Sequence, residues 1–317
     1  MSYTLCCISE KLKSEGISFK TMTWKRYNQL VETEGLDQAL ALLGDKWLEN
    51  VMVTRSHIEH CNENGWGYRV SSALFPVLTH PDFGYSVEDV PQHEEIMINF
   101  AEISEYNKEW KVRLSTHPDQ FNVLASPNQN AVDKSIRELD HQGWVMDMLG
   151  CSLSYKNPIC LHVNCTKGDP QQIADKFISN LEKCDISVQS RLVVEVEDKG
   201  IWNCDRLWDH FFQVHGIPIV FDNLHDKCNP SEKRSAWDIA ETWPCRPLFH
   251  YSEAMPDQAN PRKHADLPTG IPLGVRADWE IELKSKDFAI EAIEKLQEEE
   301  DLKVWQRNGK MFDFKPF

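Results

Sequence analysis

The chain has 317 residues, of which 41% are hydrophobic and 26% are charged, and its formal net charge is −16. This length is enough to bury a sizeable core, in one barrel or in two smaller domains. The acidic charge argues against a protein that coats nucleic acid through a broad basic surface, but it allows an enzyme that meets phosphates through local basic patches and bound cations. No apolar run reaches membrane-spanning length and the amino terminus lacks a signal-peptide pattern, so we expect a cytoplasmic chain without a membrane partner.

Short apolar runs alternate with helical patterns along the whole chain, and spacing and length distinguish the two. The expected strands are 4–8, 68–70, 113–115, 158–161, 192–194, 218–221, 247–249 and 279–283. The expected helices are 24–62 with a break near Gly35, 93–107, 130–149, 170–183, 205–214, 231–242 and 287–299. Eight strands, each followed by a helix or a long loop, favour an α/β fold with a single (β/α)8 TIM barrel over a doubly wound sheet. We expect residues 1–317 to form one domain.

Ten cysteines form no CxxC pair and no spacing typical of a disulfide framework. We expect them to be reduced and mostly buried, where they would pack as small hydrophobic side chains. The spacing does not favour a cysteine-based zinc site.

Metal-ligating side chains recur at or near the carboxyl ends of the expected strands three to eight. His117, for example, ends the third run, because Pro118 cannot continue the hydrogen bonding of a strand. The carboxyl ends of barrel strands converge on one mouth, and uncompensated buried carboxylates there would be costly, so the pattern predicts bound cations. The residues are His117, His162, Glu195, Asp222 with His225, His250 and Glu282.

The types of ligand restrict the metal and the reaction. Imidazole mixed with carboxylate and without thiolate suits zinc, manganese or iron, and it disfavours calcium or magnesium alone. Glu195 and Asp222 follow neighbouring strands and could bridge two metal ions, an arrangement used to hydrolyse phosphodiesters. The same ligands would serve a metal-dependent sugar isomerase or epimerase, so these residues alone leave both activities open.

Several segments resemble the UV damage endonucleases, in the same order and at similar separations. The most specific are Leu114-Ser-Thr-His-Pro-Asp-Gln-Phe121 and Val220-Phe-Asp-Asn-Leu-His225. The remaining segments are 68–72, 74–76, 125–127, 192–195, 197–199, 229–230, 249–252 and 264–266. The resemblance runs from the first strand to Lys286. It implies a barrel and metal cluster related to endonuclease IV, and a DNA repair endonuclease that incises damaged double-stranded DNA on the 5' side of ultraviolet photoproducts.

The resemblance also implies a ligand set for two or three divalent ions, manganese being expected first and zinc or magnesium being alternatives. Glu195 would bridge one ion, held by His117 and His162, to a second ion. His225 and His264 would hold a third. The ligands of the second ion would be Asp222, His250 and Glu282, and the catalytic residues would be Glu195, Asp222 and Glu282.

Two residues match the pair with which the family probes the duplex. Gln120 and Phe121 would enter the DNA where damaged bases are displaced, since a planar amide and an aromatic ring can fill a gap and restore stacking. The alternative is that Phe121 anchors its loop in the core. Arg69 and Lys199 lie beside the matching motifs and are the preferred phosphate contacts. We expect the chain to act as a monomer.

The chain departs from the family pattern in places. Leu248 stands where relatives can carry a lysine modified to an extra carboxylate, and Ala73 stands where some have a histidine. Leu5 is the best match to an aromatic residue near the end of the first strand. These departures keep a third possibility open, a DNA-lesion binder without catalytic activity.

Overall fold

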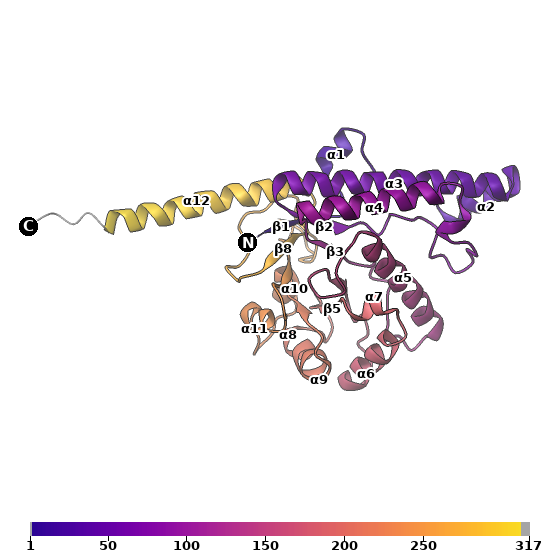
Figure 1. The fold of residues 1–317 in the computed structure, drawn as a ribbon. Helices are drawn as coiled ribbons and strands as arrows, with labels where there is room; N and C mark the ends of the chain where they lie inside the picture. The colour runs from indigo at the N-terminus through magenta and orange to yellow at the C-terminus, as the bar shows by residue number, and fades with distance from the viewer. Residues whose placement is uncertain (1, 312–317) are drawn as a thin grey trace, which may run out of the picture.

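The computed structural model describes residues 2–311, and it contains eight parallel strands arranged as a nearly closed barrel (Figure 1). The strand order is β6-β5-β4-β3-β2-β1-β8-β7, so the α/β TIM barrel expected from the sequence is confirmed. The strands are β1 (Tyr3–Cys6), β2 (Gly67–Val70), β3 (Leu114–Thr116), β4 (Ile159–Leu161), β5 (Leu192–Glu195), β6 (Ile219–Val220), β7 (Leu248–Tyr251) and β8 (Asp278–Ile281).

The barrel closes between β6 and β7 through residues of the candidate site. Asp222 and His250 form a parallel bridge there, and the backbone N–H of His250 donates to the carbonyl of Phe221 at 2.9 Å. Strand β6 has only two residues, so this seam is the least continuous part of the sheet. The geometry of the barrel therefore sets the separation of these two side chains directly.

Helices follow most of the strands and surround the barrel. The longer ones begin and end where the sequence offers caps: Thr23 caps the first, and Gly35, at φ 90°, separates α2 from α3 as expected. The helices are α1 (Glu10–Ser14), α2 (Trp24–Glu34), α3 (Leu36–Asn64), η1 (Val87–Asp89), α4 (His93–Trp110), α5 (Gln129–Met148), α6 (Pro170–Leu181), α7 (Ile186–Gln189), α8 (Cys204–Leu207), η2 (Trp208–Phe212), α9 (Gln213–His215), α10 (Asn223–Cys228), α11 (Ala236–Ala240) and α12 (Asp287–Met311).

One expected helix is shorter than its sequence pattern indicates. Of the range 231–242, only Ala236–Ala240 is α-helical. The backbone N–H groups of Glu232 and Lys233 donate to the carboxylate of Asp205 instead of entering a helix, and Ser235 begins α11 with a capping box. The short helices α1, α7 and α10 were not expected, because pieces of four to six residues are too short to show a helical period.

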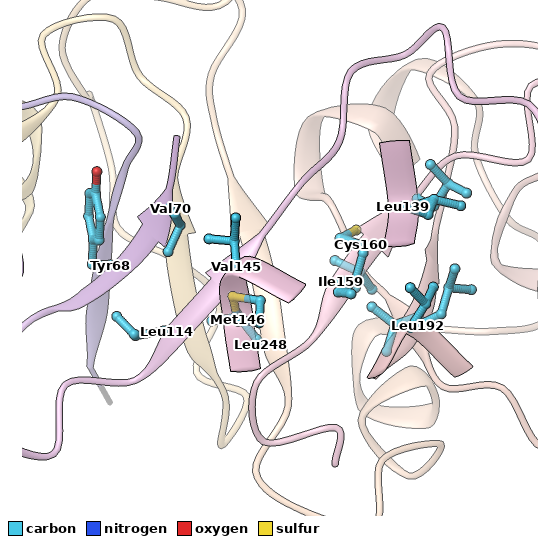
Figure 2. Close-up of a cluster of buried hydrophobic side chains, with 14 of the residues drawn as sticks. Tyr68, Val70, Leu114, Leu139, Val145, Met146, Ile159, Cys160, Leu192 and Leu248 are labelled. Atoms are coloured by element: carbon cyan, nitrogen blue, oxygen red, sulfur yellow. The ribbon is translucent and has the colours of Figure 1, made fainter. Parts of the chain in front are cut away.

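The core lies between the barrel strands and the helices outside them. Figure 2 shows side chains of β2, β3, β4 and β5 packed with Leu139, Val145 and Met146 of α5. Because this packing buries the hydrophobic faces of strands and helices together, it holds the strand ends at defined positions. Leu248, from β7, is also buried, its side chain being 2% exposed.

Two long helices extend beyond the barrel. In Figure 1, α3 runs alongside α4 on one side of the strands, and α12 projects away from the barrel at the other end. In the part of the chain that the structure describes, no helix is both long enough and apolar enough to cross a membrane.

Candidate metal centre and DNA-facing loop

The side chains expected to bind metal converge at the carboxyl ends of the strands, with Glu195 at their centre. Glu195 ends β5 and is 1% exposed. Its Oε2 lies 2.8 Å from His117 Nε2 and 3.4 Å from His162 Nε2. Its Oε1 lies 3.1 Å from Nδ1 of both His225 and His250. The structure therefore brings four imidazoles from four different strand ends around one carboxylate.

Backbone carbonyls orient two of these imidazoles. His117 Nδ1 donates to the carbonyl of Pro118 at 3.0 Å, and His225 Nδ1 donates to the carbonyl of Val196 at 2.9 Å. A neutral imidazole that donates from Nδ1 carries a lone pair on Nε2. For His117, this lone pair would face a carboxylate oxygen at 2.8 Å, which is favourable only when a proton or a metal cation lies between the two atoms.

His250 joins the centre from β7 and is held by a carboxylate on its other side. Its Nε2 lies 3.1 Å from Glu280 Oε2, which leaves Nδ1 facing Glu195 and Glu282 at 3.1 and 3.5 Å. A carboxylate that holds the far nitrogen of a histidine is the usual support for a metal-ligating imidazole, because it fixes both the tautomer and the ring orientation. Nδ1 is thus the atom of His250 that is free to bind a metal.

Asp222 caps α10 with one oxygen and keeps the other available. Its Oδ1 accepts from the backbone N–H groups of Leu224 and His225, both at 2.7 Å, so the same contact that starts the helix also positions the imidazole of His225. Oδ2 is buried and makes no hydrogen bond. Asp222 groups with His225 and Glu195 on one side and with His250 and Glu282 on the other, the ligand atoms of each group lying within 4.8 Å of one another.

Glu282 and His264 complete the expected set. Glu282 follows β8 directly, and its Oε1 lies 2.5 Å from the guanidinium of Arg69. His264 lies in the long loop after β7, where its Nδ1 donates to the carbonyl of Glu282 at 2.9 Å. The structure places His225 beside Glu195 and His264 beside Glu282, and the assignment of these two histidines to a third ion stays a prediction.

Several buried polar atoms at the mouth lack a hydrogen-bonding partner among the residues that the structure describes. They are Glu195 Oε1, Asp222 Oδ2, His162 Nδ1 and His250 Nδ1. Buried polar atoms are almost always paired, so unpaired acceptors and imidazole nitrogens gathered at the mouth indicate a place where a ligand can bind. The donor set of imidazole and carboxylate fits a divalent transition metal ion.

The electrostatics of the mouth show how strongly these groups depend on each other. Burial raises the pKa of the Glu195 carboxyl, but His250, His162, His117 and His225 together outweigh it and hold that pKa well below its usual range. Burial also lowers the pKa of His162 to about 4, so this imidazole is neutral and able to bind metal at neutral pH. Asp222 has a raised pKa, chiefly because of its burial.

Beneath the mouth lies a second layer of polar side chains that the sequence pattern missed. Glu280 is 1% exposed in β8 and accepts hydrogen bonds from Arg69 at 3.0 Å and from Ser115. We call Arg69, Ser115 and Glu280 the floor network. Glu280 was not predicted, because only residues at or near the ends of strands were considered and Glu280 lies inside β8. Residues two apart on a strand share a face, so the position of Glu282 could have indicated Glu280. In the same way, Cys160 lies two residues before His162 and shares a face of its strand with it.

Arg69 was expected to contact DNA phosphate, but its side chain is 11% exposed and ion-paired with both Glu280 and Glu282. This position supports a role in holding the two glutamates rather than in binding a phosphate. Lys199, the other expected phosphate contact, is exposed in the loop after β5.

The probing residues lie on the loop after β3. Phe121 is 78% exposed, so it is not anchored in the core. Its side chain borders a cavity of about 400 Å³ that Asn122, Thr79 and Lys134 also line. Asn164, from the loop after β4, donates to the backbone carbonyl of Gln120 at 3.0 Å and so ties this loop to its neighbour. An exposed aromatic ring on a tethered loop beside the barrel mouth can reach a large ligand outside the protein.

Comparisons with known proteins identify the family of this chain. The family model described as UV-endonuclease UvdE matches residues 1–313. A UV DNA damage endonuclease of Nostoc sp. is 33% identical over 301 residues, covering 90% of this chain and 87% of that protein. One of Bacillus velezensis is 29% identical over 290 residues, covering 87% and 85%.

Comparison with solved structures finds the same barrel fold. The crystal structure of SacUVDE matches with a TM-score of 0.76 at 25% identity, covering 94% of this chain and 98% of that one. A D-tagatose 3-epimerase-like protein matches with a TM-score of 0.51 at 11% identity, and this likeness shows the fold alone. Fold and relatives together define a TIM-barrel endonuclease of DNA repair. The chain belongs to the UV-endonuclease UvdE family, and it is a UV damage endonuclease.

Proposed function

We propose that this enzyme incises double-stranded DNA on the 5' side of ultraviolet photoproducts. We also propose that incision requires two or three divalent ions, and manganese is the ion that we expect. The observation that carries the metal dependence is the set of unpaired buried atoms around Glu195 and Asp222. Membership of an endonuclease family favours this function over the sugar isomerase and over the lesion binder without catalytic activity.

The proposed ligands have separate roles in metal binding and catalysis. His117, His162, Glu195, Asp222, His225, His250, His264 and Glu282 would hold the ions. Bound divalent ions supply a nucleophile from water at neutral pH and neutralise charge on the leaving oxygen. Glu195, Asp222 and Glu282 would be the catalytic carboxylates. His250 is kept in its binding orientation by Glu280, and His225 by the carbonyl of Val196.

The substrate contacts would lie beside the metal centre. Phe121 and Gln120 would enter the duplex at the lesion, where an aromatic ring supplies the stacking surface that the displaced bases no longer provide. Lys199 would meet the phosphate backbone, and Arg69 is not proposed for that role because it is held by two glutamates. We also propose a single domain that acts as a monomer, which light scattering on the purified chain would test.

The decisive experiment uses end-labelled duplex DNA, irradiated or not, with manganese and with or without a chelator. We expect cutting of the irradiated duplex alone, at bonds on the 5' side of the lesions, and loss of cutting with the chelator. Equal cutting of both duplexes, cutting on the 3' side, or full activity after chelation and dialysis would each contradict one part of the proposal.

A further inference from the structure

Cys160 occupies a position in the barrel that its expected role as a hydrophobic filler does not explain. It lies in β4 two residues before His162, so both side chains face the barrel interior. Cys160 is 4% exposed, and its Sγ donates a hydrogen bond to Glu195 Oε2 at 3.5 Å. Sγ, a ring nitrogen of His117 and a carboxylate oxygen of Glu195 lie within 4.8 Å of one another.

The separations of these donor atoms suit a single small ion. Tetrahedral zinc with Zn–S near 2.3 Å and Zn–N or Zn–O near 2.0–2.1 Å separates sulfur from oxygen by about 3.5 Å and nitrogen from oxygen by about 3.3 Å. Here Sγ of Cys160 lies 3.5 Å from Glu195 Oε2, and His162 Nε2 lies 3.4 Å from the same oxygen. His117 Nε2, at 2.8 Å, is closer and would move outward slightly.

A second observation points to a ligand of the same carboxylate. The other oxygen of the same carboxylate, Glu195 Oε1, is buried and makes no hydrogen bond, and Nδ1 of His250 facing it makes none either. The side chain of Glu195 is 1% exposed, so water outside the protein cannot satisfy this oxygen. The sulfur thus adjoins a carboxylate of which one oxygen, Oε1, lacks a hydrogen-bonding partner.

We propose that Cys160 is a fourth protein ligand of the ion held by His117, His162 and Glu195. The inference rests on the metal centre proposed above and deepens it, because a thiolate makes this position prefer a thiophilic ion such as Zn²⁺ or Co²⁺ over Mn²⁺. On binding, a sulfur–metal bond forms, the S–H bond breaks, and the proton passes to the solvent without any oxidation or reduction.

The first test follows cobalt by its absorption spectrum. The wild-type chain titrated with Co²⁺ should develop the near-ultraviolet band that arises from charge transfer between a thiolate and Co²⁺. Cys160→Ser should still bind Co²⁺ but without this band, and it should lose at least about 10- to 100-fold in Zn²⁺ affinity, the usual loss for a residue that only orients a ligand, while its Mn²⁺ affinity changes little. The matched control is Cys184→Ser, since Cys184 is also 4% exposed and lies outside the barrel mouth.

The second test needs no variant and so does not depend on how the mutants fold. X-ray absorption on the wild-type chain, loaded with one equivalent of Zn²⁺, should show a sulfur neighbour at about 2.3 Å. A shell of nitrogen and oxygen alone, or a cobalt band that survives in Cys160→Ser, overturns the proposal for Cys160 and leaves the metal centre in place. Failure of the chain to bind either ion overturns both.

Discussion

The mouth and the floor of the barrel both bury carboxylates, but they compensate them differently. Glu280 in the floor network is surrounded by protein donors, with Arg69, Ser115 and His250 all in contact. Glu195 at the mouth is equally buried but has one oxygen with no hydrogen bond. Because a buried charge needs a partner of opposite sign, the comparison shows that the charge of Glu280 is compensated within the protein, although Arg69 Nε makes no hydrogen bond, and it supports the proposal that cations compensate the mouth.

The comparison also explains why the two layers are adjacent. His250 touches both, with Nε2 on Glu280 and Nδ1 on Glu195, and Arg69 reaches both Glu280 and Glu282. A fixed lower layer holds the ligands above it within narrow limits, which a metal centre requires before any ion binds. Four predictions test this division of roles, beginning with the largest expected effect.

Replacing the central carboxylate should remove activity without unfolding the protein. We expect Glu195→Gln to reduce incision of irradiated duplex by more than about 100-fold, since a bridging ligand should cost more than the supporting residues that orient ligands. Metal affinity, measured by calorimetry, should fall in parallel, while circular dichroism stays unchanged. Glu182→Gln, at an exposed position after α6, is the control. Undiminished incision by the Glu195 variant would remove the bridging role.

Breaking the floor should act first on stability. Arg69→Met leaves Glu280 and Glu282 buried without their guanidinium, and we expect a loss of about 3–5 kcal/mol in unfolding free energy. Arg55→Met removes an exposed pair with Glu102 and should cost only about 0–1 kcal/mol. Denaturant titration of both variants gives the comparison. Equal losses would show that the floor contributes no more than a surface ion pair.

The pH dependence of that loss should identify the buried glutamates paired with Arg69, Glu280 among them, as its origin. Burial raises the pKa of Glu280, but Arg69, His250 and Ser115 together lower it to about 2, from 4.5 for an unperturbed glutamate. A carboxyl whose pKa is lower in the folded state than in the unfolded state stabilises the folded state fully above pH 4.5. This stabilisation disappears as the pH falls toward 2. In Arg69→Met, burial without the guanidinium raises the pKa of these carboxyls, so the stability difference from wild type should shrink as they become protonated and continue to shrink as the pH falls toward 2. A difference that stays constant down to about pH 3 would exclude the pair as its source.

The smallest effect is expected outside both layers, at the probing loop. Phe121→Ala should weaken binding to irradiated duplex by about 1–3 kcal/mol, the usual contribution of one base stacked on an aromatic ring. Stability should change by less than about 0.5 kcal/mol, because Phe121 is 78% exposed. Phe121→Trp should retain binding, and Trp237→Ala, at another exposed aromatic residue, serves as the control. Equal binding by wild type and Phe121→Ala, measured by fluorescence anisotropy, would argue against insertion into the duplex.

The barrel and most of the positions around its mouth could be predicted from the sequence. Alternating apolar runs and helical periods place the strands within a few residues, because a buried parallel strand needs a continuous apolar segment. Residues that follow these runs, such as His117 and Asp222, could be recognised because the carboxyl ends of barrel strands always meet at one face.

The contacts that each of these residues makes follow from the tertiary structure and could not be predicted from the sequence. The pairing of Arg69 with Glu280 and Glu282 joins strands that are far apart in the sequence, and Cys160 approaches Glu195 from the neighbouring strand. Composition and spacing carry no information on such contacts, because they depend on how far the strands tilt and on which side chains fill the barrel interior. The same limit applies to Arg69 itself: its place beside a motif suggested a DNA contact, but the burial of its guanidinium follows from the closed barrel.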